Sequence, residues 1–95
     1  MRATIPPELQ LEGATINTSY GTGGQVLAVT GPYPPDPDWH IRPWMGGYTI
    51  VYTPPIGGGK CWINEVHVVD GHIYAHPWRD EIEVVDVGVQ QTRLF

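Results

Sequence analysis

The chain has 95 residues, of which 41% are hydrophobic and 16% are charged. This length supports one domain with a modest core, and the hydrophobic fraction excludes a chain that stays disordered. The 12 glycines and 10 prolines leave few windows long enough for a helix, so the composition predicts short strands joined by turns.

The charge balance disfavours direct binding to nucleic acid. Five basic residues stand against ten acidic ones, giving a net charge of -5, and no cluster of Lys and Arg offers a site for phosphates. The single cysteine, Cys61, cannot form an internal disulfide, and no signal-like apolar segment follows Met1. These features predict a cytoplasmic protein, and the lack of a long apolar run predicts no membrane contact.

The first half of the chain predicts few regular elements. Residues 1–24 indicate an N-terminal arm with one short strand and a flexible glycine-rich loop at residues 21–24. Residues 25–30 are rich in β-forming side chains and predict a strand that stops at Gly31-Pro32. Residues 31–47 contain five prolines and three large aromatic residues, which predicts a long loop that has a function or packs as a lid.

The second half of the chain predicts four strands, over residues 48–53, 61–69, 72–76 and 81–87. Asp70-Gly71 between the second and third of these is the signature of a two-residue type I′ hairpin. In that register Val68 faces Ile73 and Val66 faces Ala75 on one side of the hairpin. The opposite side then carries Glu65, His67, Val69, His72, Tyr74 and His76.

These elements predict an all-β fold. Five to six short strands with one tight hairpin and long Pro/Gly loops are typical of a small, partly open antiparallel barrel, for which an SH3-like (Src-homology-type) barrel is the first expectation and a small sandwich the second. Gly88 ends the last strand. We therefore expect a barrel domain over residues 1–88 and a flexible C-terminal tail over residues 89–95.

The outer face of the hairpin carries side chains of the types that bind zinc, namely Glu65, His67, His72 and His76. Their spacing matches no familiar ligand pattern, and Val69 shares the same face. A solvated polar face is therefore the favoured interpretation, and neither a metal nor a cofactor is expected. A metal or small-ligand module on the three histidines stays open as a less favoured hypothesis.

No residue pattern indicates an enzyme. Cys61 lies within a predicted strand with no base linked to it by any signature, which favours a half-buried structural cysteine. The glycine runs at 21–24 and 57–59 lack the strand-to-helix context of a phosphate-binding loop. Carboxylate pairs such as Asp36 and Asp38 have no partner group that would give them a catalytic role.

Four tryptophans are many for a chain of this size. Trp62 and Trp78 are expected to fill the small core, since tryptophan is heavily buried on average. Trp39 and Trp44 lie in the long loop, where an aromatic side chain can anchor an interface as well as pack inward. These two residues are therefore a second candidate interface.

The last five residues, Gln91-Thr92-Arg93-Leu94-Phe95, resemble the Gln-x-x-Leu-Phe pentapeptide of proteins that bind the bacterial β sliding clamp. Gln91 matches the polar position of that motif, and Leu94 and Phe95 match its two hydrophobic anchors. Thr92 and Arg93 depart from the commoner residues, which affects the expected affinity. The alternative is that the tail continues the last strand and Phe95 folds back onto the barrel.

The resemblance implies a non-enzymatic protein that binds the β subunit of bacterial DNA polymerase III, the sliding clamp, through residues 91–95. Such a protein would compete with polymerases for their docking pocket and inhibit host DNA replication, as a small phage-encoded factor of host takeover would. The Trp39 and Trp44 loop would add contacts to the clamp. The alternative function is a structural or accessory protein of a phage head or tail.

Overall fold

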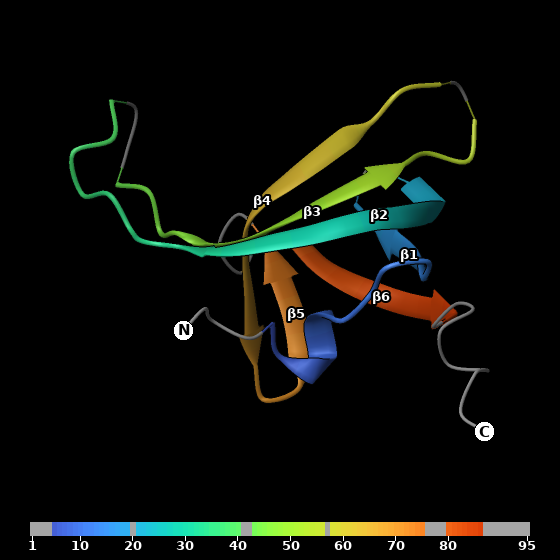
Figure 1. Ribbon diagram of the computed structural model, residues 1–95, viewed down its shortest axis with the longest axis horizontal. Coiled ribbons are helices and arrows are strands. Elements are labelled where there is room, and N and C mark those ends of the chain that lie inside the picture. Colours follow the sequence, from blue (N-terminus) through green and yellow to red (C-terminus); the bar gives the residue numbers. More distant parts are fainter. Residues whose placement is uncertain (1–4, 20, 41–42, 57, 76–79, 87–95) are drawn as a thin grey trace.

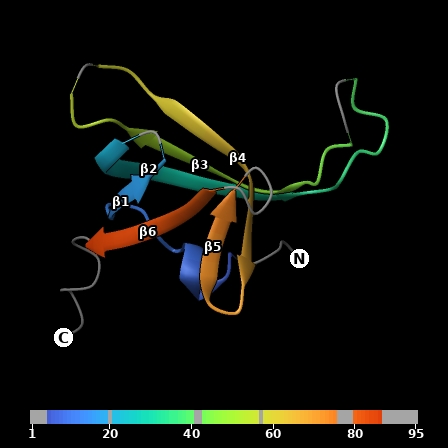
Figure 2. The same ribbon diagram turned by 180° about the vertical axis from the view of Figure 1, so that it is seen from behind.

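The computed structural model describes residues 5–19, 21–40, 43–56, 58–75 and 80–86, and these form an antiparallel β-barrel (Figures 1 and 2). The elements of this part of the chain are a short 3-10 helix, η1 (Pro7–Leu9), and six strands, β1 (Thr15–Thr18), β2 (Gly21–Tyr33), β3 (Gly47–Thr53), β4 (Cys61–Val69), β5 (His72–Ala75) and β6 (Asp80–Asp86). The predicted all-β class and small antiparallel barrel are thus confirmed. The predicted tail, residues 89–95, lies outside the described residues.

The barrel closes through its first and last strands. Each strand pairs with the next along the chain, and β1 pairs with β6 through Ile16 opposite Val84 and Asn17 opposite Glu83. A closed ring leaves no unpaired edge of the kind that promotes aggregation. The structure therefore refines the partly open barrel expected from the sequence.

Isoleucine, valine and leucine side chains fill the barrel. Side chains alternate across a strand except at bulges. The inward-facing set of the strands includes Ile16, Val26, Ile50, Ile63, Ile73 and Ile82. The segment around η1 adds Leu9 and Leu11, which are buried against this cluster. Each such side chain contributes about 1.5–3 kcal/mol through its removal from water.

Strand β2 is longer at both ends than the sequence predicts. The glycine run at its start is paired with β1 and is not a loop, because Gly24 leaves room for the ring of Tyr52. A Cβ atom at Gly24 would lie 2.8 Å from Tyr52 Cδ2.

At the C-terminal end of β2, the prediction that the strand ends at Gly31-Pro32 is wrong, because β2 continues to Tyr33. These two residues fall within an irregularity of the β2–β3 pairing, where a proline without an N–H is tolerated.

The Asp70-Gly71 hairpin is confirmed. Asp70 and Gly71 have φ angles of 52° and 81°, as a type I′ turn requires, and Val68 lies opposite Ile73. His76, the last residue of the strand predicted over 72–76, lies outside the described residues.

A bulge in β4 overturns two predictions about which face side chains occupy. The β3–β4 register shifts between Tyr48 and Ile50, and Glu65 adopts a φ of 58° there. The extra residue reverses the alternation, so Glu65 is buried instead of lying on the polar outer face. For the same reason Trp62 is 60% exposed and does not fill the core. Trp78 lies outside the described residues.

The Asp80 carboxylate, at the start of β6, links this strand to the end of β1. Asp80 is buried, and its two oxygens accept hydrogen bonds from the backbone N–H of Ser19 at 3.1 Å and from Ser19 Oγ at 2.9 Å.

We expect Asp80→Ala to lower the free energy of unfolding by about 2–3 kcal/mol, because a buried donor loses its acceptor. Ser19→Ala removes one of the two bonds and should cost about 1 kcal/mol. Urea denaturation followed by circular dichroism measures both, and equal losses would contradict this role of Asp80.

Candidate functional site

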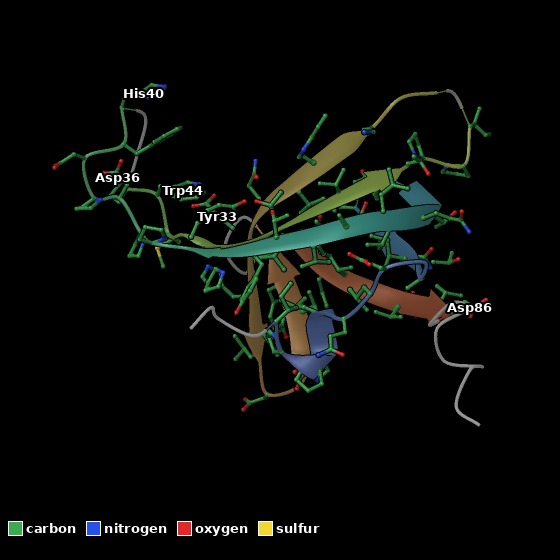
Figure 3. All side chains as sticks on the ribbon, in the orientation of Figure 1. Tyr33, Asp36, His40, Trp44 and Asp86 are labelled. Atoms are coloured by element: carbon green, nitrogen blue, oxygen red, sulfur yellow. The ribbon has the colours of Figure 1, made fainter. Side chains whose placement is uncertain are left out.

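The predicted clamp-binding residues, 91–95, lie outside the described part of the chain. The last described residue is Asp86 at the end of β6, labelled in Figure 3. The nine residues that follow it span at most about 30 Å when fully extended. The position of Asp86 therefore limits which surfaces of a bound partner the barrel can reach.

The described residues of the loop between β2 and β3, 34–40 and 43–46, form an arm that projects from the barrel (left in Figure 1). Aromatic residues gather at the base of the arm, where Figure 3 shows Trp44 beside Tyr33 at the end of β2; His40 lies at the outer tip. Ring centroids lie 6.0 Å apart for Trp39 and Trp44, and 6.3 Å apart for Tyr33 and Trp44. The expected loop is thus present, and its two tryptophans are in one cluster.

Hydrogen bonds hold the arm in place. Asp36 and Trp44 exchange two backbone hydrogen bonds of 2.8 Å, which make an isolated antiparallel bridge. The backbone N–H of Met45 donates to Glu65 Oε2 at 2.9 Å, which ties the arm to the bulge in β4. Ordering the arm before a ligand arrives lowers the entropy cost of binding.

An open groove of about 390 Å³ runs over the outer face of β2, β3 and β4 and reaches the base of the arm. The described residues that line it are Thr30, Tyr33, Trp44, Thr49, Val51, Trp62 and Asn64. Trp62 lies directly opposite Val51 in the β3–β4 ladder. None of these lining residues carries a charge.

Two side-chain hydrogen bonds order the polar part of the groove. Thr49 Oγ1 donates to Asn64 Oδ1 at 2.9 Å, and Tyr33 Oη donates to Thr30 Oγ1 at 2.9 Å. The first bond fixes the orientation of the Asn64 amide, and the second holds the Tyr33 ring over β2. The groove therefore presents fixed hydroxyl and amide groups beside aromatic rings.

The arm and the end of β6 lie at opposite ends of the molecule. Figures 1 and 2 show this separation from both sides, along the longest axis, which measures 45 Å. Figure 3 places Trp44 and Asp86 accordingly. This arrangement favours two independent surfaces over the joint contact with one partner that the sequence predicts for Trp39, Trp44 and residues 91–95.

His72 of the hairpin lies apart from Glu65. His72 Nδ1 lies 2.7 Å from Glu81 Oε2 on the surface, whereas Glu65 is buried in the bulge. His76 lies outside the described residues. Among the residues that the structure describes, no group of three or more His, Cys, Asp or Glu side chains is placed to hold a metal ion.

Cys61 is half-buried against the core, as predicted for a structural cysteine.

Comparison of the chain with protein-family models, curated proteins and solved structures found no match. Within the described ranges, no helix has the length and apolar character needed to span a membrane.

The groove does not follow from the sequence alone. The sequence predicts Trp62 in the core and indicates no role for Thr49 or Asn64. The available signal was the alternation Trp62-Ile63-Asn64, in which one face is apolar and the other carries an aromatic and an amide side chain. Without the position of the bulge, that alternation does not show which face lies outside.

Proposed function

We propose that this chain is a non-enzymatic, cytoplasmic protein that binds the bacterial β sliding clamp through residues 91–95. It competes there with polymerases and inhibits host DNA replication, as a phage-encoded factor. The observation that carries the proposal is the pentapeptide itself, with Gln91, Leu94 and Phe95 at the motif positions. The net charge of -5 and the lack of a basic cluster agree with a target that is a protein and not DNA.

The anchors supply the binding energy in this proposal. Burial of Leu94 and Phe95 in an apolar pocket contributes about 1.5–3 kcal/mol each, and Gln91 fixes the register through hydrogen bonds. Ordering of the peptide opposes binding by about 1–2 kcal/mol per residue, so we expect the tail to bind with a dissociation constant in the micromolar range or weaker.

The test is a titration of the purified chain against a purified bacterial clamp by isothermal calorimetry. We expect the double variant Leu94→Ala/Phe95→Ala to weaken binding at least about 100-fold, which is the loss of about 3 kcal/mol. The matched control is Leu27→Ala/Ile56→Ala, because both residues are exposed and apolar but lie outside the tail, in β2 and in the β3–β4 loop. Unchanged binding by the Leu94/Phe95 variant would reject the tail as the contact, and absence of binding by the wild type would reject the partner.

Inhibition is tested separately from binding. A clamp-dependent primer-extension reaction should slow when the wild-type chain is added, because polymerase and chain compete for one pocket. The Leu94→Ala/Phe95→Ala variant should leave the reaction unchanged. Binding without any slowing of extension would mean that the chain uses the clamp as a landing site and does not inhibit replication.

A further inference from the structure

The groove over β2, β3 and β4 has the chemistry of a ligand site. Exposed tryptophan on a sheet face is unusual, since a large apolar ring in water is unfavourable. Trp62 is 60% exposed in the groove, and Trp44 and Tyr33 complete the aromatic lining at the base of the arm. Aromatic rings in this position offer flat apolar faces to a ligand.

The polar groups between the rings include both donors and acceptors. The Asn64 side chain is exposed and carries two Nδ2 hydrogens, while its Oδ1 accepts from Thr49. Thr30 Oγ1 accepts from Tyr33 and carries a hydrogen of its own to donate. The exposed Tyr33 hydroxyl has a further lone pair with which to accept, whereas Thr49 is buried and serves to orient Asn64. A ligand that both donates and accepts hydrogen bonds, as a hydroxyl group does, is complementary to this set.

The absence of charge among the described lining residues narrows the ligand class. A single-stranded nucleic acid needs Lys or Arg along its phosphates, and the chain has a net charge of -5. A proline-rich peptide presents mainly carbonyl acceptors, so it would use the donors of Asn64 and Thr30 but would offer few donors to the Tyr33 oxygen. A neutral sugar presents C–H faces to the rings and hydroxyl groups to Thr30 and Asn64.

We propose that the groove lined by Tyr33, Trp44, Trp62, Thr30, Thr49 and Asn64 binds a neutral oligosaccharide. The sugar rings stack on Trp62 and on the aromatic residues at the base of the arm, and the hydroxyl groups bond with Asn64 and Thr30 between them. The ordered arm and the fixed Asn64 amide make the site largely preformed.

The test uses maltohexaose, cellohexaose, mannohexaose and chitohexaose as probes, with two-dimensional amide and indole NMR spectra as the readout. We expect at least one hexasaccharide to shift the Trp62 indole and Asn64 amide signals saturably. Trp62→Ala should weaken that binding about 10-fold or more, which corresponds to the loss of one good aromatic contact. Ile56→Ala is the matched control, because Ile56 is 87% exposed and does not line the groove.

A second variant tests the hydrogen-bond assignment. Asn64→Asp keeps the oxygen that accepts from Thr49 but replaces the two Nδ2 donors, so it should fold normally and weaken sugar binding about 10-fold or more. Binding by none of the four sugars would overturn the proposal. So would sugar binding that Trp62→Ala and Asn64→Asp leave unchanged, or Trp62-dependent binding of a polyproline peptide or oligo-dT without any binding of sugar.

This site is independent of the proposed clamp contact. Trp62→Ala should leave clamp binding unchanged, and Leu94→Ala/Phe95→Ala should leave sugar binding unchanged. Failure of either proposal can therefore be recognised without reference to the other.

Discussion

We expect Gly47→Ala to be among the most destabilising single substitutions in this barrel, with a loss of about 4 kcal/mol or more in the free energy of unfolding. Gly47 has a φ of 94°, and a Cβ atom there would lie 2.6 Å from the carbonyl oxygen of Val66 and 2.9 Å from His67 Cε1. Val66 cannot withdraw, because its pairing with Tyr48 holds β4 against β3. Strain in the backbone and a collision with the backbone of β4 therefore act together.

The substitution Gly59→Ala distinguishes backbone strain from the collision with β4. The φ of 88° at Gly59 is close to that of Gly47, but a Cβ atom there would meet no atom within 4 Å. Gly59→Ala should thus cost only the strain of a left-handed alanine, about 1–2 kcal/mol. Urea denaturation of both variants with circular dichroism gives the comparison. Equal losses at Gly47 and Gly59 would show that the collision with β4 does not contribute.

The local parts of this fold could be predicted from the sequence. The Asp70-Gly71 turn and the β-rich runs on either side of it determine the β4–β5 hairpin without reference to the rest of the chain. The strand at β3 is likewise bounded by glycine and proline signals. Glycine and proline throughout the chain exclude long helices, and so a small barrel is the expected result.

The bulges could not be predicted, because each depends on the strand that lies beside it. Glu65 enters the left-handed region where the β3–β4 pairing gains a residue, and Gly31-Pro32 continues β2 within a similar irregularity. A shift of one residue moves every later side chain to the other face. That shift puts Glu65 inside and Trp62 outside, and for this reason the groove was missing from the sequence prediction. The pentapeptide at 91–95 is a local pattern and stays a prediction.

We expect Glu65→Ala to lower the free energy of unfolding by about 2–4 kcal/mol. Glu65 is 2% exposed, and its Oε2 accepts the hydrogen bond from the N–H of Met45. The substitution removes that acceptor and leaves a cavity while the backbone keeps its φ of 58°. Exchange of the Met45 amide hydrogen with solvent should become faster, because this bond ties the arm to the barrel. Both effects are measured on one sample, by urea denaturation and by hydrogen-exchange NMR.

Glu65→Gly tests whether the backbone of the bulge is strained. Alanine normally stabilises a strand more than glycine, by roughly 0.5–1 kcal/mol. At Glu65 we expect the reverse order, because glycine relieves about 1–2 kcal/mol of left-handed strain that alanine retains. Glu83→Ala is the control for loss of a carboxylate, since Glu83 is exposed and accepts one hydrogen bond from Asn17 at 3.0 Å; it should cost at most about 1 kcal/mol. An alanine variant more stable than the glycine variant would mean that the backbone at Glu65 is not strained. Unchanged Met45 exchange in both variants would mean that Glu65 does not hold the arm.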